Sequence, residues 1–158
     1  MEWHSVASTE GTPSQTAPAV DPTRASQTDA AVRDIVTVRL PAAAAYLAVV
    51  RTTTASLAAR LNFTLDEIED MRIAVDEASC LLLAGATDDA ELTCVFEMFP
   101  DSMQVSVSVM TNRGHSPARD SFAWTVLTAL AGQVDAWTDP DGRQTISLVK
   151  RREWDATS

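Results

Sequence analysis

The stretch from Thr64 to Leu83, TLDEIEDMRIAVDEASCLLL, constrains the fold more than any other part of the sequence. Thr64 is followed three residues later by Glu67, which is the pattern of a helix N-cap with a capping box. Apolar residues then recur at spacings of three and four, which predicts a long helix with one face on a core. That face comprises Leu65, Ile68, Met71, Val75, Ala78 and Leu82.

Glu77 lies on a second stripe of the same helix, with Ile73 and Leu81 one turn away on either side. A carboxylate on an apolar stripe costs desolvation free energy unless it is paired or lines a wet cavity. Two interpretations are open. Glu77 either lies at the solvated edge of the stripe or pairs with an arginine, which is the commoner case, or it is a functional carboxylate.

Composition limits the class of protein. A chain of 158 residues with 46% hydrophobic and 22% charged residues is expected to form one globular domain. No run approaches the ~18 uninterrupted apolar residues of a membrane span. The first ten residues have neither the basic segment nor the apolar core of a signal peptide, so a cytoplasmic location is expected. Cys80 and Cys94 have no metal-ligand spacing, and we expect both to be small core residues.

The net charge of −10 argues against nucleic acid as a partner, because duplex binding needs Lys and Arg to displace counterions. An acidic surface suits a basic protein partner, although solubility alone is the stronger explanation of the charge. The candidate contacts for such a partner are Glu69, Asp70, Asp88, Asp89 and Glu91.

The order of elements predicts the fold class. Residues 1–33 lack apolar periodicity and are interpreted as a disordered tail, residues 34–152 as the domain, and residues 153–158 as a short polar tail. The expected elements are a strand at 34–40, helices at 42–61 and 64–85, strands at 91–98 and 103–110, a third helix, and a hairpin at 133–137 and 143–151. The third helix is expected to be capped by Asp120 or Ser121. Its expected buried face comprises Phe122, Ala123, Val126, Leu127 and Leu130. This order is typical of an α+β, two-layer α/β sandwich, with helices on one face of a mixed, mostly antiparallel sheet.

Three segments carry a resemblance to a known family: MRIAVDEAS at 71–79, SFAWTVLTALAGQVDAW at 121–137 and DGRQTISLVKR at 141–151. In this order they resemble the bacterial anti-sigma-factor serine kinases of the SpoIIAB/RsbW type over residues 34–152. The resemblance implies the histidine-kinase-like (GHKL) ATPase fold with a Bergerat ATP site. It implies that Glu77 is the general base and that Asn112, Gly114 and Thr145 contact the nucleotide.

The sequence departs from the family pattern where metal and phosphate bind. The family places an asparagine one turn after the base to hold Mg²⁺, but Leu81 has no oxygen to offer. The family's DxGxG motif falls on NRGHS at 112–116. Phe122 and Trp124 stand where glycines let the backbone approach phosphate, after a short lid at 116–120. We therefore expect weak ATP binding at most, no magnesium site, and a degenerate kinase fold kept as a protein-binding module.

Three functions remain open at this point. The resemblance implies an anti-sigma factor that sequesters an alternative sigma factor and is switched by an anti-anti-sigma protein; it also implies a homodimer. The alternative is an active protein-serine kinase that phosphorylates the anti-anti-sigma protein with ATP, with Glu77 as its base. A small sandwich scaffold unrelated to transcription is the third hypothesis.

Overall fold

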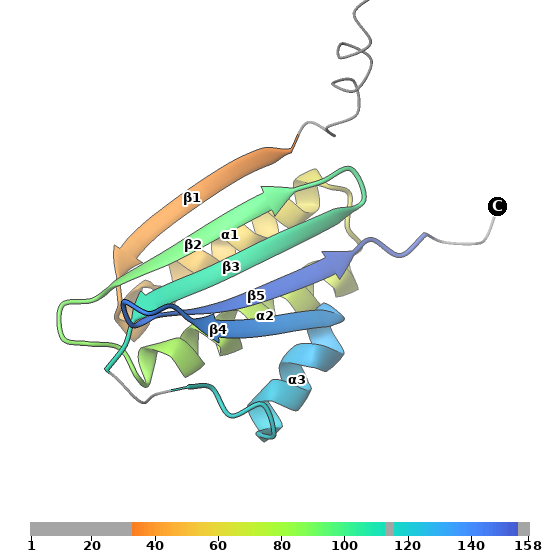
Figure 1. Ribbon diagram of the computed structural model, residues 1–158. Coiled ribbons are helices and arrows are strands. Elements are labelled where there is room, and N and C mark those ends of the chain that lie inside the picture. The colour runs from red at the N-terminus through yellow and green to blue at the C-terminus, as the bar shows by residue number, and fades with distance from the viewer. Residues whose placement is uncertain (1–32, 113–115, 155–158) are drawn as a thin grey trace, which may run out of the picture. The chain divides into compact units, whose positions relative to one another are not determined.

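The computed structural model describes residues 33–112 and 116–154 (Figure 1). The tail expected at residues 1–33 lies outside the described residues except for Arg33, as do residues 155–158. The elements are β1 (Asp34–Pro41), the short 3-10 helix η2 (Ala44–Tyr46), α1 (Leu47–Arg60), α2 (Leu65–Leu83), β2 (Glu91–Met98), β3 (Ser102–Met110), α3 (Phe122–Ala131), β4 (Gln133–Thr138) and β5 (Arg143–Arg151). Apart from η2, this is the order of elements that the sequence predicts.

The strands form one sheet in the order β1-β2-β3-β5-β4, and every neighbouring pair is antiparallel. The expectation of a mixed sheet is therefore wrong. A single helix between two neighbouring strands usually leaves those strands parallel. Two helices lie between β1 and β2, so the chain reverses direction one extra time and β2 runs antiparallel to β1. The crossover through α3 leaves β4 running in the same direction as β3, but β5 lies between those two strands.

The helices cover one face of the sheet, as the sequence predicts (Figure 1). Side chains alternate along each strand, so every second residue faces the helices. In β3, Val105, Val107 and Val109 are fully buried on that side, while Ser106 and Ser108 face the other. Met71 and Leu82 of α2 are fully buried in the same core. Burial of each such side chain stabilises the fold by roughly 1.5–3 kcal/mol.

The helix starts show where the sequence pattern fails. Thr64 caps α2 with the expected capping box, and Ser121, rather than Asp120, caps α3. Leu65 and Phe122 were expected on buried faces, yet they are 83% and 84% exposed. Each is the first residue of its helix and, at about 100° per residue, lies more than 100° from the middle of the buried stripe.

The first helix begins later than the sequence predicts. Pro41 does not open it, because Pro41 is still extended and pairs with Glu91 as the last residue of β1. The chain then passes through η2, and the α-helix starts at Leu47. Leu47 and Val50 are the buried residues of its first turn.

Candidate functional site

Three segments meet at the C-terminal end of α2. The Asn112 N–H donates to the Gly85 carbonyl at 3.2 Å, and the Thr87 N–H donates to the Met110 carbonyl at 3.0 Å. The Thr111 N–H donates to the Gly142 carbonyl at 3.0 Å, which brings in the β4–β5 turn. The structure therefore places Asn112 beside the helix that carries Glu77. Gly114, the neighbouring candidate, lies outside the described residues.

Glu77 lies on α2, about 12 Å along the helix axis before Gly85. Its side chain is half-buried, and its carboxylate forms no hydrogen bond or ion pair with the part of the chain that the structure describes. The adjacent carboxylate, Asp76, takes the arginine of α1 instead, with Arg51 Nη1 at 2.7 Å from Asp76 Oδ1. Glu77 therefore lies unpaired at the solvated edge, where it can accept a proton or a hydrogen bond from a bound group.

Leu81 lies one turn after Glu77, at the position where the family holds its metal. The Leu81 side chain is half-buried and packs against the core cluster. It supplies apolar contact there and has no oxygen, whereas Mg²⁺ takes oxygen ligands in near-octahedral geometry. The donor set around Glu77 does not fit the divalent cation that the fold family implies.

Thr145 is not on the same side of the sheet as Glu77. In β5, Ile146 and Leu148 belong to the core, so Thr145 and Ser147 face away from the helices. The Ser147 hydroxyl confirms this direction, because it bonds the side chains of Gln104 and Ser106 on the open side of β3. The assignment of Thr145 to a nucleotide site shared with Glu77 is thus corrected, since the sheet lies between the Thr145 side chain and α2.

The segment before α3 is fixed to the edge strand β4 by Arg119. Its Nη2 lies 2.8 Å from Asp135 Oδ1 and donates to the Ala136 carbonyl at 2.6 Å. Its guanidinium also lies over the Trp124 ring, 5.2 Å from the centroid. Sequence reasoning missed this residue, although an arginine placed before an aromatic helix start was a usable signal. The short lid segment at 116–120 is therefore attached to β4 through Arg119. Phe122, which follows this segment, is exposed to solvent.

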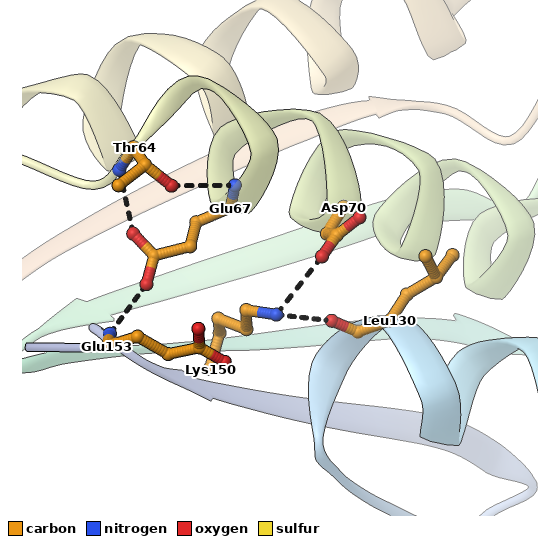
Figure 2. Close-up of polar contacts among 6 residues, drawn as sticks. All are labelled: Thr64, Glu67, Asp70, Leu130, Lys150 and Glu153. Carbon is orange, nitrogen blue, oxygen red and sulfur yellow. Dashed lines mark hydrogen bonds and ion pairs between the residues drawn. The ribbon is translucent and has the colours of Figure 1, made fainter. Parts of the chain in front are cut away.

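The five carboxylates predicted for a partner form two separate groups. Glu69 is paired with Arg72 on the surface of α2, and Asp70 forms an ion pair with Lys150 at 3.2 Å. Figure 2 shows the Lys150 ammonium between Asp70 and the Leu130 carbonyl. The Lys150 side chain is only 12% exposed. Asp70 is therefore the half-exposed member of an ion pair and is less available to a partner than an unpaired carboxylate; its role as a partner contact stays a prediction.

The second group lies beyond the other end of α2, at least about 20 Å of helix from Asp70. Asp88 and Asp89 are exposed there, and neither forms a hydrogen bond or ion pair with the described residues. Glu91 is also exposed and lies 3.9 Å from Arg39 Nε. Asp88 and Asp89 are thus the free carboxylates of the predicted set.

Comparisons of the sequence and the fold show which known proteins this chain is similar to. The chain is 37% identical over 98 residues to the anti-sigma-F factor RsbW of Mycobacterium tuberculosis, covering 62% of this chain and 57% of that protein. It is 39% identical over 72 residues to the serine-protein kinase RsbW of Bacillus cereus, covering 44% and 45% respectively. The chain is a homologue of the RsbW proteins. The chain spans about half the length of these curated relatives, and no family model matches it.

A solved structure shows the same fold. It is the crystal structure of the RsbU and RsbW domains of Rv1364c from Mycobacterium tuberculosis, with a TM-score of 0.61 and 17% sequence identity, covering 78% of this chain and 34% of that one. The α+β fold expected from the sequence, with helices on one face of the sheet, is confirmed. No helix in the described ranges is long and apolar enough to cross a membrane.

Proposed function

We propose that this protein is an anti-sigma factor that binds and sequesters an alternative sigma factor. An anti-anti-sigma protein controls it by partner switching, competing for the same molecule. The observation that carries the proposal is the 37% identity over 98 residues to proteins named anti-sigma-F factor. The shared fold supports it.

The residues around Glu77 favour binding over catalysis. Phosphoryl transfer depends on positioning and on metal electrostatics. Leu81 removes an oxygen ligand, and Phe122 and Trp124 place bulky side chains at the start of α3, where backbone would have to approach phosphate. Sequestration by contact needs none of these groups. We propose that ATP binds weakly at most and that Mg²⁺ has no dedicated site.

Asp88 and Asp89 are the acidic contacts that the structure leaves available. Sigma factors carry basic surfaces that contact DNA, and an inhibitor with exposed carboxylates can mask them. Opposite charges at the rim of an interface mainly speed association and make it sensitive to salt. The exposed pair Asp88 and Asp89 fits that role better than Asp70, which is already paired with Lys150.

A second candidate is supported by relatives named serine-protein kinase and by the unpaired carboxylate of Glu77. In this alternative the protein phosphorylates a serine of the anti-anti-sigma protein, and Glu77 takes the proton from the serine hydroxyl. The chain's own contribution would be that proton transfer, with Asn112 beside the adenine.

Labelled ATP separates the two candidates. The full chain is incubated with Mg-ATP and a cognate anti-anti-sigma protein, beside the Glu77→Gln variant as a matched control. Sequestration alone predicts no transfer of label, together with retention of the sigma factor by both proteins. Serine phosphorylation that disappears in Glu77→Gln would establish the kinase instead.

A further inference from the structure

Strand β4 forms one edge of the sheet. It is the last strand in the order of the sheet and, among the described strands, pairs with β5 alone. An edge strand presents a row of backbone N–H and C=O groups that can pair with another chain, and proteins limit this with charged side chains, bulges or covering segments. The six residues QVDAWT carry a single charged side chain, Asp135. One charge gives little protection by itself, so the groups around β4 decide how open this edge is.

The turn after β4 shows which backbone groups of the strand point outward. The Asp139 N–H donates to the Arg143 carbonyl at 2.8 Å, one step beyond the last pair of the β4–β5 ladder. Bonded and non-bonded residues alternate along an antiparallel pair. The odd-numbered residues of β4 therefore bond β5. The N–H and C=O groups of Val134, Ala136 and Thr138 point to the open side, with Ala136 in the middle.

Two side chains bind both outward groups of Ala136. The Ala136 N–H donates to Asp135 Oδ1 at 2.8 Å, and the Ala136 carbonyl accepts from Arg119 Nη2 at 2.6 Å. The two side chains also bind each other, with Arg119 Nη2 at 2.8 Å from Asp135 Oδ1. Among the described residues, the outward backbone groups of Val134 and Thr138 have no hydrogen-bond partner. The edge is therefore occupied at its centre.

Arg119 is held in position for this contact. Its guanidinium lies over the Trp124 ring of α3, 5.2 Å from the centroid. The Trp124 N–H in turn donates to the hydroxyl of Ser121, the N-cap of α3, at 3.2 Å. A guanidinium that stacks on a ring keeps its N–H groups free to donate in its own plane. An exposed ion pair alone contributes little, so the ring and the backbone acceptor are what fix Arg119.

We infer that Arg119 and Asp135 form a clip that closes the middle of β4 to the addition of another strand. An added strand bonds every second residue, about 6.6 Å apart, so it needs the outward groups of Val134, Ala136 and Thr138 in a row. With the clip in place, Ala136 offers neither a donor nor an acceptor, and the guanidinium lies where the backbone of the added strand would bond. The clip involves neither a sigma factor nor nucleotide, so it stands independently of the proposed function.

Amide hydrogen exchange of the full chain, followed by NMR, tests the bond from Ala136 to Asp135. The Val134 and Ala136 amides both point outward, but of the two only Ala136 has an acceptor among the described residues. After allowance for intrinsic rates, Ala136 should exchange about three- to tenfold more slowly than Val134, the effect of one net hydrogen bond. Asp135→Ala should remove this difference. Equal rates in the wild type, or an unchanged Ala136 rate in Asp135→Ala, would overturn the inference.

Removal of the whole clip tests whether it closes the edge. Arg119→Ala combined with Asp135→Ala should lose soluble protein several-fold faster than the wild type on incubation at high concentration, and infrared spectra should show intermolecular β-structure. The control, Arg72→Ala with Glu69→Ala, removes another exposed ion pair away from the edge and should stay soluble. Far-UV circular dichroism should show that both double variants are folded; should the first unfold, Asp135→Ala alone takes its place. A clip variant as soluble as the control, without intermolecular β-structure, contradicts the inference.

Discussion

The carboxylate of Glu67 accepts a hydrogen bond from the backbone N–H of Glu153 at 2.6 Å, although the two residues are 86 positions apart (Figure 2). Its other oxygen accepts the Thr64 N–H at 2.7 Å, and the side chain is almost fully buried. One residue therefore closes the N-terminus of α2 and holds the chain as it leaves β5. The start of the second helix and the end of the last strand are stabilised together.

This contact predicts a specific dependence of stability on acid. Burial raises the pKa of the Glu67 carboxyl, but hydrogen bonds from Glu153 and Thr64 and the nearby Lys150 charge outweigh burial and leave that pKa below its ordinary value. The unfolded chain then binds more protons than the folded one in the interval between the two values. The stabilisation is present above about pH 4.3, the ordinary value, and is lost as pH falls through the lowered pKa.

Glu67→Gln should therefore lower the free energy of unfolding at pH 7 by about 1–3 kcal/mol, and this difference should shrink below about pH 4. Urea unfolding at a series of pH values measures it. Glu69→Gln, in the same helix but exposed, is the control and should change little. A loss of stability in Glu67→Gln that stays constant down to about pH 2 would contradict the role given to the ionised carboxylate.

The Lys150–Asp70 pair makes a second prediction. Lys150→Ala should destabilise the protein by about 1–3 kcal/mol, because it leaves the Leu130 carbonyl and the half-exposed Asp70 without a donor. Asp70→Ala should lower the free energy of unfolding by a similar amount, because the nearly buried Lys150 ammonium then keeps only the Leu130 carbonyl as a partner. A double-mutant cycle measured by thermal unfolding should give a coupling of about 0.5 kcal/mol or more. Additive single effects would mean that the pair contributes nothing.

The fold could be predicted from sequence where its determinants are local. The capping box of Thr64, the alternation of Val105, Val107 and Val109, and the turn at Gly142 each depend on residues close in the chain. Strand order was not predictable in the same way, because the insertion of β5 between β3 and β4 depends on distant pairing. The expectation of a mixed sheet failed for that reason.

The candidate site was predictable only in part. The family resemblance implied a nucleotide contact for Asn112, and the backbone bond from Asn112 to Gly85 places this residue at the C-terminal end of α2. The direction of Thr145 depends on strand parity, which a family motif does not state, and the partner of Asp70 lies 80 residues away in β5. Such long-range pairs leave no periodic signal in a single sequence.

The two cysteines should differ sharply in reactivity. Burial raises the pKa of the Cys94 thiol to about 12, and Cys94 is fully buried. Cys80 is exposed, but partial desolvation and the charges of Asp76 and Glu77 raise its pKa as well. Because the thiolate is the nucleophile, an aromatic disulfide reagent should modify one thiol per native chain, slowly at pH 7 and faster as pH rises.

Glu77→Gln tests the cause, since removal of one negative charge should lower the pKa of the Cys80 thiol and speed its modification at pH 7. Cys80→Ser should abolish the native reaction, and denaturant should expose both thiols of the wild type. Fast reaction of Cys94 in the folded protein, or an unchanged rate in Glu77→Gln, would be inconsistent with these environments.

The exposed carboxylates after α2 predict an effect on association. Asp88→Lys combined with Asp89→Asn should slow binding of the sigma factor several-fold and flatten the dependence of the association rate on salt, while dissociation changes little. Asn is chosen because Asp89 has a φ of 59°, a conformation that Asn adopts more readily than Lys. Association measured over a salt series checks this, with Asp66→Asn, an exposed change at the N-terminal end of α2, as the control. An identical rate at every salt concentration would exclude the pair as a contact.

The central claim is that this chain inhibits a sigma factor by binding it directly, and that this binding needs no nucleotide. The most direct measurement is equilibrium binding of the full chain to each alternative sigma factor of its host, with EDTA and no ATP, and again with Mg-ATP. The account predicts that one sigma factor is bound in EDTA and that Mg-ATP changes the dissociation constant by less than about threefold, under 1 kcal/mol. Binding that appears only with Mg-ATP, or no binding to any of these sigma factors, would contradict it.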